Sequence, residues 1–206
     1  MNSLEQIFRL GHYDMPPEVE RVLEKVARPL RVVDLGANVG LFAAYIRERF
    51  ADAEIAAFEP DPDNLAVLRR SAQEDRRPWD VIAACADVED REVQFTVGGF
   101  TNSRVETNGA APTRTVAAVD VFPFLSDVDL LKIDIEGSEW AILADPRFAD
   151  VPARVVALEY HAHLCPTHEP EPLAHQLLRR AGYDTLERED FDAPPGHGMI
   201  WAWKAE

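Results

Sequence analysis

The stretch from Arg31 to Gly40, RVVDLGANVG, decides the fold. A short apolar run ends in Asp34 and leads into a turn with two glycines, and the residues after it, LFAAYIRERF, have apolar side chains at helical spacing. Strand, glycine turn and helix in this order are typical of an open α/β sheet, in which the first N–H groups of the helix are available to a ligand. The turn is not GxGxxG, because Ala37 and Asn38 occupy its middle.

The alternation of strand and helix continues toward the carboxyl terminus. Short apolar segments alternate with amphipathic segments of helical period. Because apolar strands separated by helices bury both of their faces, this alternation predicts a mostly parallel sheet with helices on each side. The expected strands are 54–58, 80–85, 128–135 and 154–160, and the expected helices are 41–50, 64–72, 138–143 and 172–181.

Two segments depart from this alternation. Residues 92–97, EVQFTV, have the period of two of a half-buried strand and, with a short strand near 113–118, predict a small antiparallel β insertion. At the carboxyl end, strands at 183–186 and 199–203 follow each other without a helix between them. This ending predicts an antiparallel hairpin at one edge of the sheet.

Residues 1–30 are expected to form a helical preface, because apolar residues recur at helical spacing after a Pro-Pro pair. His12 and Tyr13 in this segment could belong to a flap over the site. The remainder, residues 31–206, has the length of one domain, so we expect a single domain overall.

The composition argues against several classes of function. The net charge is −16 and the arginines form no sustained basic run, so nucleic-acid binding is not expected. No apolar run is long enough to cross a bilayer, and the amino terminus has no secretion-signal pattern, so we expect a cytoplasmic protein without a membrane partner. Cys85 and Cys165 form neither a metal motif nor a disulfide framework. The expected partner is a small molecule, neutral or cationic, although solubility alone can explain the charge, and the oligomeric state is not indicated.

Glu59 follows the second strand, about twenty residues after the glycine turn, where an acid can accept hydrogen bonds from both ribose hydroxyls of a nucleoside. NAD and S-adenosylmethionine both carry this ribose. The pyrophosphate of NAD needs a close approach to the turn, which Asn38 would crowd. S-adenosylmethionine instead brings an ammonium and a carboxylate, for which Asp34 and Asn38 are suitable polar partners. The residues favour S-adenosylmethionine, and an NAD-linked oxidoreductase is the alternative.

Three segments, VVDLGANVG, AAFEPDPDN and LLKIDIEGSEWAIL, occur in this order along the chain. Together they resemble the FkbM-type family of S-adenosylmethionine-dependent methyltransferases, from about Arg31 to about Tyr160. The resemblance implies an α/β fold with the Rossmann-like seven-stranded methyltransferase sheet. It also implies methyl transfer to a hydroxyl oxygen of a small molecule, sugar or natural product. A non-catalytic adenosine-binding partner protein is a further alternative.

The resemblance also indicates which residues would bind the cofactor. The glycine turn would hold the methionine moiety, Glu59 the ribose, and the residues after the third strand the adenine. Asn is frequent in the family at the position of Cys85, so the adenine contact differs here. The implied cofactor residues are Asp34, Gly36, Ala37, Asn38, Gly40, Glu59, Pro60, Cys85, Ala86, Asp87 and Asp134.

Acidic residues and histidines gather at the ends of two neighbouring strands. Lys132, Asp134 and Glu136 share a face of one strand, and Glu159 and His161 share a face of the next. Ligands of open α/β sheets bind at this edge, so the acids and His161 are expected to lie together. His161 could accept the proton of the substrate hydroxyl, with Asp134 or Glu159 orienting it. The three acids and His161 could instead hold a divalent cation, which we do not expect, or His161 could simply satisfy its neighbours.

Fewer residues of the sequence indicate where the methyl acceptor binds. Asn102 and Ser103 lie in the loop of the insertion, where a GxxNS-like pattern recurs in the family near the acceptor. Glu136 and His197 could reach the same rim. Trp140 is expected to pack in the core rather than to stack on a substrate.

Overall fold

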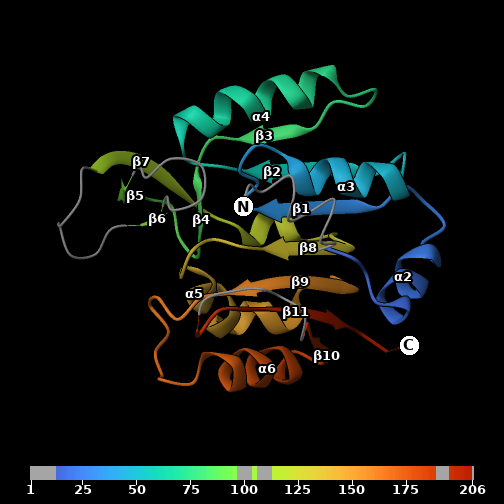
Figure 1. The fold of residues 1–206 in the computed structure, drawn as a ribbon, viewed down its shortest axis with the longest axis vertical. Coiled ribbons are helices and arrows are strands. Elements are labelled where there is room, and N and C mark those ends of the chain that lie inside the picture. The colour runs from blue at the N-terminus through green and yellow to red at the C-terminus, as the bar shows by residue number, and fades with distance from the viewer. Residues whose placement is uncertain (1–12, 97–103, 106–112, 189–194, 206) are drawn as a thin grey trace.

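The computed structural model describes residues 13–96, 104–105, 113–188 and 195–205, which form two β-sheets flanked by helices (Figure 1). The larger sheet has seven strands in the order β10-β11-β9-β8-β1-β2-β3, and the pairs from β9 to β3 are all parallel. This order confirms the predicted Rossmann-like methyltransferase sheet. Its strands are β1 (Arg31–Leu35), β2 (Glu54–Phe58), β3 (Asp80–Ile82), β8 (Leu130–Ile133), β9 (Val155–Tyr160), β10 (Asp184–Glu187) and β11 (Gly198–Trp203).

The carboxyl-terminal pair is antiparallel, as the sequence predicts. β11 pairs antiparallel with both β9 and β10, so it lies inside the sheet and β10 forms the edge. Its sequence, GMIWAW, is buried from Gly198 to Ala202. Such a continuous apolar run is typical of a strand covered on both faces.

The predicted insertion is a four-stranded sheet that lies to the left of the main sheet in Figure 1. β7 pairs antiparallel with β5 and parallel with β4. The expected single strand at 80–85 is divided into β3 and β4, because the chain bends at Ala84, whose N–H donates to the carbonyl oxygen of Ile82 at 3.0 Å. The strands of this sheet, in the order β4-β7-β5-β6, are β4 (Cys85–Asp87), β7 (Thr113–Asp120), β5 (Arg91–Thr96) and β6 (Arg104–Val105).

Alternating side chains of the main strands separate two core layers. Val32 of β1 packs in the first layer and Val33 in the second, because successive side chains of a strand point to opposite faces. Trp140 is 4% exposed in the second layer, which confirms that it packs in the core. The first layer is covered by α2 (Pro17–Glu24), α3 (Leu41–Arg49) and α4 (Pro62–Glu74), and the second by α5 (Glu139–Ala144), α6 (Pro170–Arg180) and the 3₁₀ turns η1 (Phe122–Leu125) and η2 (Pro146–Asp150).

The preface contributes α2 to the first layer. Val19 and Leu23, four residues apart, are fully buried, and the acidic residues of this helix remain toward solvent. The helix packs against β9 and β11.

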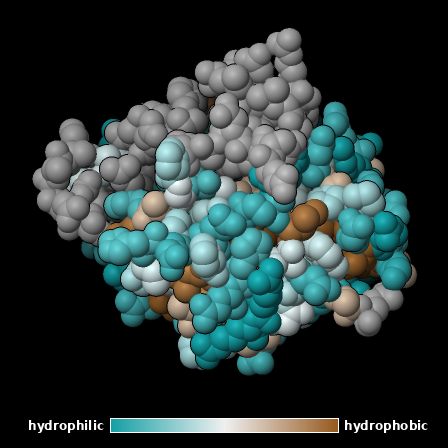
Figure 2. Space-filling model, turned by 60° about the horizontal axis from the view of Figure 1, so that its bottom comes forward, coloured by the Kyte–Doolittle hydropathy of each residue, from teal (hydrophilic) through white to brown (hydrophobic). Residues whose placement is uncertain are grey.

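The surface agrees with the acidic composition. On the face shown in Figure 2 the described residues are mostly hydrophilic, and the hydrophobic ones lie in small separate patches. Among the described helices, none combines the length and the hydropathy that spanning a bilayer requires.

Candidate active site

The turn after β1 folds against the ends of both neighbouring strands. Gly36 and Asn38 have positive φ angles of 83° and 51°. Glycine is required at position 36, because a Cβ there would lie 1.8 Å from the carbonyl oxygen of Asp134. The N–H groups of Gly36 and Ala37 donate to the carbonyl oxygen of Phe58 at 3.1 and 2.8 Å. These contacts fix the turn at the carboxyl edge of the sheet.

Glu59, directly after β2, lies beside this turn and is 5% exposed. Its Oε2 accepts the N–H of Asn38 and its Oε1 accepts the N–H of Asp61, both at 2.8 Å. The side-chain amide of Asn64, in the first turn of α4, also hydrogen-bonds to Glu59. Burial raises the pKa of Glu59 to about 7, and the hydrogen bonds only partly oppose this rise. The acid expected to bind a ribose is thus held in one orientation.

A pocket connects Glu59 with the residues after β8. Seven of the cofactor residues expected from the sequence line it: Gly36, Asn38, Glu59, Pro60, Cys85, Ala86 and Asp134. The rest of the wall is formed by Phe58, Asn64, Ala84, Phe95, Ile135, Glu136 and Ser138.

The other four expected cofactor residues lie behind the pocket wall. Asp34 is fully buried at the end of β1, Ala37 is 4% exposed, and Gly40 precedes the first turn of α3. Asp87 accepts a hydrogen bond from the Nε of Arg91 at 2.7 Å. In this arrangement the four residues support the turn and the wall rather than line the pocket.

Lys132 is a buried cation beneath the turn, with 3% exposure. Its Nζ donates to the carbonyl oxygen of Gly36 at 2.7 Å. The same atom lies 3.2 Å from Oδ1 of Asp34 and 3.1 Å from Oδ2 of Asp134. Burial alone would lower the pKa of Lys132, but the charges of Asp134 and Asp34 outweigh it and hold the pKa well above its usual value. A charged lysine therefore joins the turn to both strand ends.

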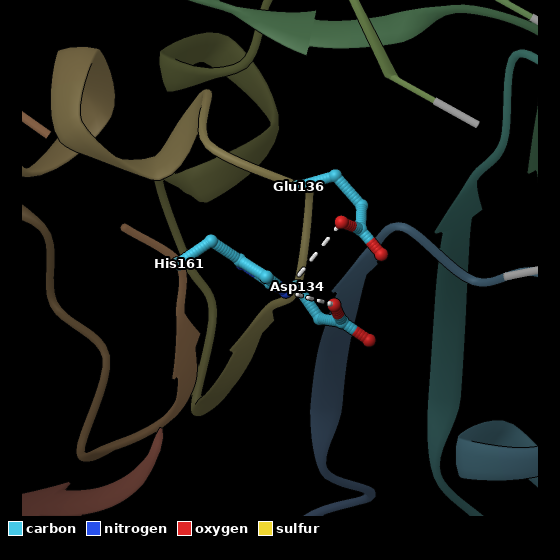
Figure 3. A group of neighbouring side chains, drawn as sticks. All are labelled: Asp134, Glu136 and His161. Atoms are coloured by element: carbon cyan, nitrogen blue, oxygen red, sulfur yellow. Dashed lines mark ion pairs between the residues drawn. The ribbon is translucent and has the colours of Figure 1, made fainter. Parts of the chain in front are cut away.

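The acids and the histidine expected at this edge do lie together. His161, directly after β9, is 4% exposed and points toward the residues after β8 (Figure 3). Its Nε2 lies 3.9 Å from Oδ1 of Asp134 and 3.8 Å from Oε2 of Glu136. Oε1 of Glu159 is 3.9 Å from the same nitrogen. Atoms of Asp134, Glu136 and His161 lie within 4.8 Å of one another, a separation that could hold a metal ion.

The charge state of His161 follows from its other neighbour, Glu139. Oε1 of Glu139 accepts the backbone N–H of His161 at 2.8 Å and lies 3.2 Å from Nδ1. Burial lowers the pKa of His161, but the hydrogen bond to Glu139 and the charges of Glu139, Asp134 and Glu159 outweigh it and raise the pKa to about 10. A raised pKa lets His161 keep a second proton to higher pH than an ordinary histidine, whereas the sequence-based hypothesis has the neutral imidazole accept the proton of the substrate. Burial, together with the charge of Asp134, raises the pKa of Glu159.

Glu139 was not assigned a role from the sequence, although it is the last acid of KIDIEGSE. It is fully buried, and its Oε2 accepts the N–H of Gly137 at 2.7 Å. An acid in the first turn of a helix, next to a glycine turn and a strand-end histidine, is the signal that could have identified it.

Glu136 occupies an unusual backbone conformation. Its φ is +55°, and that of the following Gly137 is +105°. A residue other than glycine in the left-handed region is strained, and such residues concentrate at functional sites. This turn places Glu136 in the wall of the pocket, one-third exposed.

Two other expected residues reach the rim. Tyr13, of the preface, is 6% exposed, and its hydroxyl lies 3.5 Å from Oδ2 of Asp134. The ring of His197 packs edge-on against His161, with centroids 5.0 Å apart. Outside the described residues lie Asn102, Ser103 and His12.

The strand order, with antiparallel β11 between β9 and β10, and the pocket at the carboxyl edge define the class as a Rossmann-like methyltransferase. A solved structure of an rRNA methylase from Streptococcus thermophilus has a similar fold, with a TM-score of 0.55 and 8% identity over 92% of this chain and 95% of that one. Residues 34–185 match the methyltransferase FkbM domain, so the chain belongs to the FkbM family of S-adenosylmethionine-dependent methyltransferases.

Curated relatives of this chain are methyltransferases too. The hexuronic acid methyltransferase AglP of Haloferax volcanii is 26% identical over 201 residues, which cover 93% of this chain and 81% of the relative. Methyltransferase 1 of Beauveria bassiana is 26% identical over 195 residues, covering 80% and 76%. Between the two cofactors considered from the sequence, family membership favours S-adenosylmethionine over NAD.

The raised pKa of Glu59 predicts how cofactor affinity changes with pH. A carboxylate accepts ribose hydroxyl hydrogen bonds and its protonated form does so less well, so binding favours the ionised state. With a pKa of about 7, Glu59 is ionised above neutral pH and protonated below it. We expect the affinity for S-adenosylhomocysteine, measured by calorimetry, to be constant near about pH 8 and to fall up to ~tenfold per unit below about pH 7. Glu59→Gln should bind more weakly at pH 8 and lose this slope, and a flat wild-type curve would contradict the assignment.

Proposed function

We propose that this protein transfers a methyl group from S-adenosylmethionine to a hydroxyl oxygen of a sugar or a similarly polar small molecule. The observation that carries the proposal is the continuity of the pocket. Glu59 lines it after β2, the turn of Gly36 and Asn38 after β1, and Asp134 and Glu136 at the β8 end. Gly36, Asn38 and Glu59 fit an adenosine with an amino-acid tail. Carboxylates at the β8 end are suited to bind and deprotonate a hydroxyl.

The fit of the residues to the cofactor rests on two features. The turn of Gly36 and Asn38 lines the pocket between a strand and the start of a helix, where backbone N–H groups can contact a ligand. Glu59 presents a buried carboxylate to the pocket. When bound, S-adenosylmethionine supplies an electrophilic methyl carbon, to which the acceptor oxygen bonds as the carbon–sulfur bond breaks and leaves its electron pair on sulfur.

The proton of the acceptor goes to Glu136 in this proposal. Glu136 lines the pocket, whereas His161 is buried behind it and already protonated at neutral pH. The imidazolium of His161 lies 3.8 Å from Oε2 of Glu136, so its charge favours the ionised carboxylate that accepts a proton. Asp134, held by Lys132, orients the hydroxyl.

The name of the Haloferax volcanii relative, hexuronic acid methyltransferase, supports a sugar acceptor. The test is a transfer assay with methyl-labelled S-adenosylmethionine and a panel of methyl hexosides, methyl hexuronides and matching amino sugars, with products located by mass spectrometry. We expect a methyl ether on a hexoside or hexuronide. Methylation confined to the amino group of amino sugars would contradict the proposal. Binding of S-adenosylhomocysteine without transfer to any member would favour the non-catalytic adenosine-binding alternative.

A further inference from the structure

Asn64 lines the pocket, and its side-chain amide hydrogen-bonds to Glu59. It is the third residue of α4 and is 3% exposed. The N-cap of this helix, Asp61, accepts the N–H of Asp63 at 2.9 Å and so fixes the first turn. The helix start therefore holds Asn64 against the cofactor end of the pocket.

The contact with Glu59 determines which way the Asn64 amide faces. A carboxylate only accepts hydrogen bonds, so the NH₂ group of Asn64 must be the donor. The carbonyl oxygen Oδ1 consequently faces away from Glu59. This atom is buried and has no hydrogen-bond partner within the described part of the chain. Buried polar atoms almost always have a partner, and Asn64 lines the pocket, so a ligand there is a candidate donor to Oδ1.

The acceptor capacity of Glu59 is limited. An ionised carboxylate offers about four lone-pair sites. The N–H groups of Asn38 and Asp61 and the amide of Asn64 occupy three of them. A single site remains, which suits one ribose hydroxyl and not two. The sequence-based expectation that Glu59 binds both hydroxyls therefore needs a second acceptor.

We propose that Oδ1 of Asn64 accepts one ribose hydroxyl of the bound cofactor while Glu59 accepts the other. The proposal rests on the proposed function, since it requires an adenosyl ligand in this pocket. Both residues line the pocket and hydrogen-bond to each other, so the two acceptors are neighbours.

Calorimetric titration of Asn64→Leu with three ligands tests whether Asn64 and Glu59 each accept one ribose hydroxyl. The ligands are S-adenosylhomocysteine and its 2′-deoxy and 3′-deoxy analogues. In the wild type each missing hydroxyl should weaken binding by about tenfold, the effect of one hydrogen bond. In Asn64→Leu one analogue should bind within about twofold of S-adenosylhomocysteine, because the acceptor of its missing hydroxyl is gone, while the other analogue still binds about tenfold more weakly. Glu59→Gln should show a reduced penalty for that other analogue.

Equal weakening of all three ligands in Asn64→Leu would overturn the proposal, because Asn64 would then only support Glu59. Unchanged binding of S-adenosylhomocysteine by this variant would overturn it too. Gln176→Leu removes an exposed side-chain amide of α6 as a matched control and should retain both wild-type penalties. Failure of the wild type to bind S-adenosylhomocysteine at all would instead refute the proposed function. Circular dichroism of each variant checks that the chain is folded.

Discussion

Glu136→Gln is expected to lower kcat by about 10²–10³-fold, within the range for loss of a general base. Gln preserves the size and most polar contacts of Glu136 but cannot take a proton at neutral pH. Because Glu136 lies at the acceptor end of the pocket and Glu59 at the other, the affinity for S-adenosylhomocysteine should change by less than about threefold. The measurement pairs steady-state kinetics on the acceptor found in the panel with calorimetry of S-adenosylhomocysteine.

An exposed acid provides the control for this variant. Glu92 in β5 is exposed, so Glu92→Gln removes the same charge without touching the pocket and should retain wild-type kcat. If Glu136→Gln retains wild-type kcat, the proton has another acceptor and the proposed role of Glu136 is wrong. A loss of cofactor affinity as large as the loss of kcat would mean that Glu136 shapes the cofactor site instead.

Lys132→Met is expected to destabilise the protein by about 3–5 kcal/mol, the usual cost of breaking a buried ion pair. Lys132 is 3% exposed, and its removal leaves Asp34 and Asp134 facing each other without a cation. For a chain of this size such a loss lowers Tm by roughly 6–20 °C. Thermal unfolding of the variant checks this expectation.

Two further variants distinguish the effect of the Lys132 charge on stability from the effect of its packing. Lys204 donates to the carbonyl oxygen of Val151 at 2.7 Å, but no buried acid depends on it, so Lys204→Met should cost less than about 1.5 kcal/mol. Adding Asp34→Asn to Lys132→Met removes one unpaired charge and should recover part of the lost stability. Equal stabilities of Lys132→Met and the wild type would show that the pair contributes nothing.

Much of the fold could be predicted because the chain alternates apolar strands and amphipathic helices with few exceptions. The continuous apolar runs identified the parallel strands, and the missing final helix identified the antiparallel hairpin. The bend at Ala84, which moves β4 into the second sheet, gave no signal because the segment DVIAAC is uniformly apolar after its first residue. The position of β11 inside the sheet depends on pairing between distant segments, which local pattern does not encode.

The sequence predicted which residues lie in the site better than it predicted their protonation and hydrogen bonding. The positions of Gly36, Glu59 and Asp134 at strand ends followed from topology, since parallel strands end at one edge. The protonated state of His161 did not, because it depends on Glu139, twenty-two residues earlier, reaching its ring. The role proposed for Asn64 could not be predicted either, because it depends on one buried oxygen that has no hydrogen-bond partner among the described residues.

We propose that the pocket lined by Glu59, Asp134 and Glu136 holds the adenosyl group at Glu59 and directs its sulfur toward the other two residues. A crystal structure of the wild type with S-adenosylhomocysteine tests it most directly. We expect the ribose hydroxyls to lie against Glu59 and Asn64, with the sulfur facing Asp134 and Glu136. A ligand bound elsewhere, or with its ribose at Glu136, would contradict it.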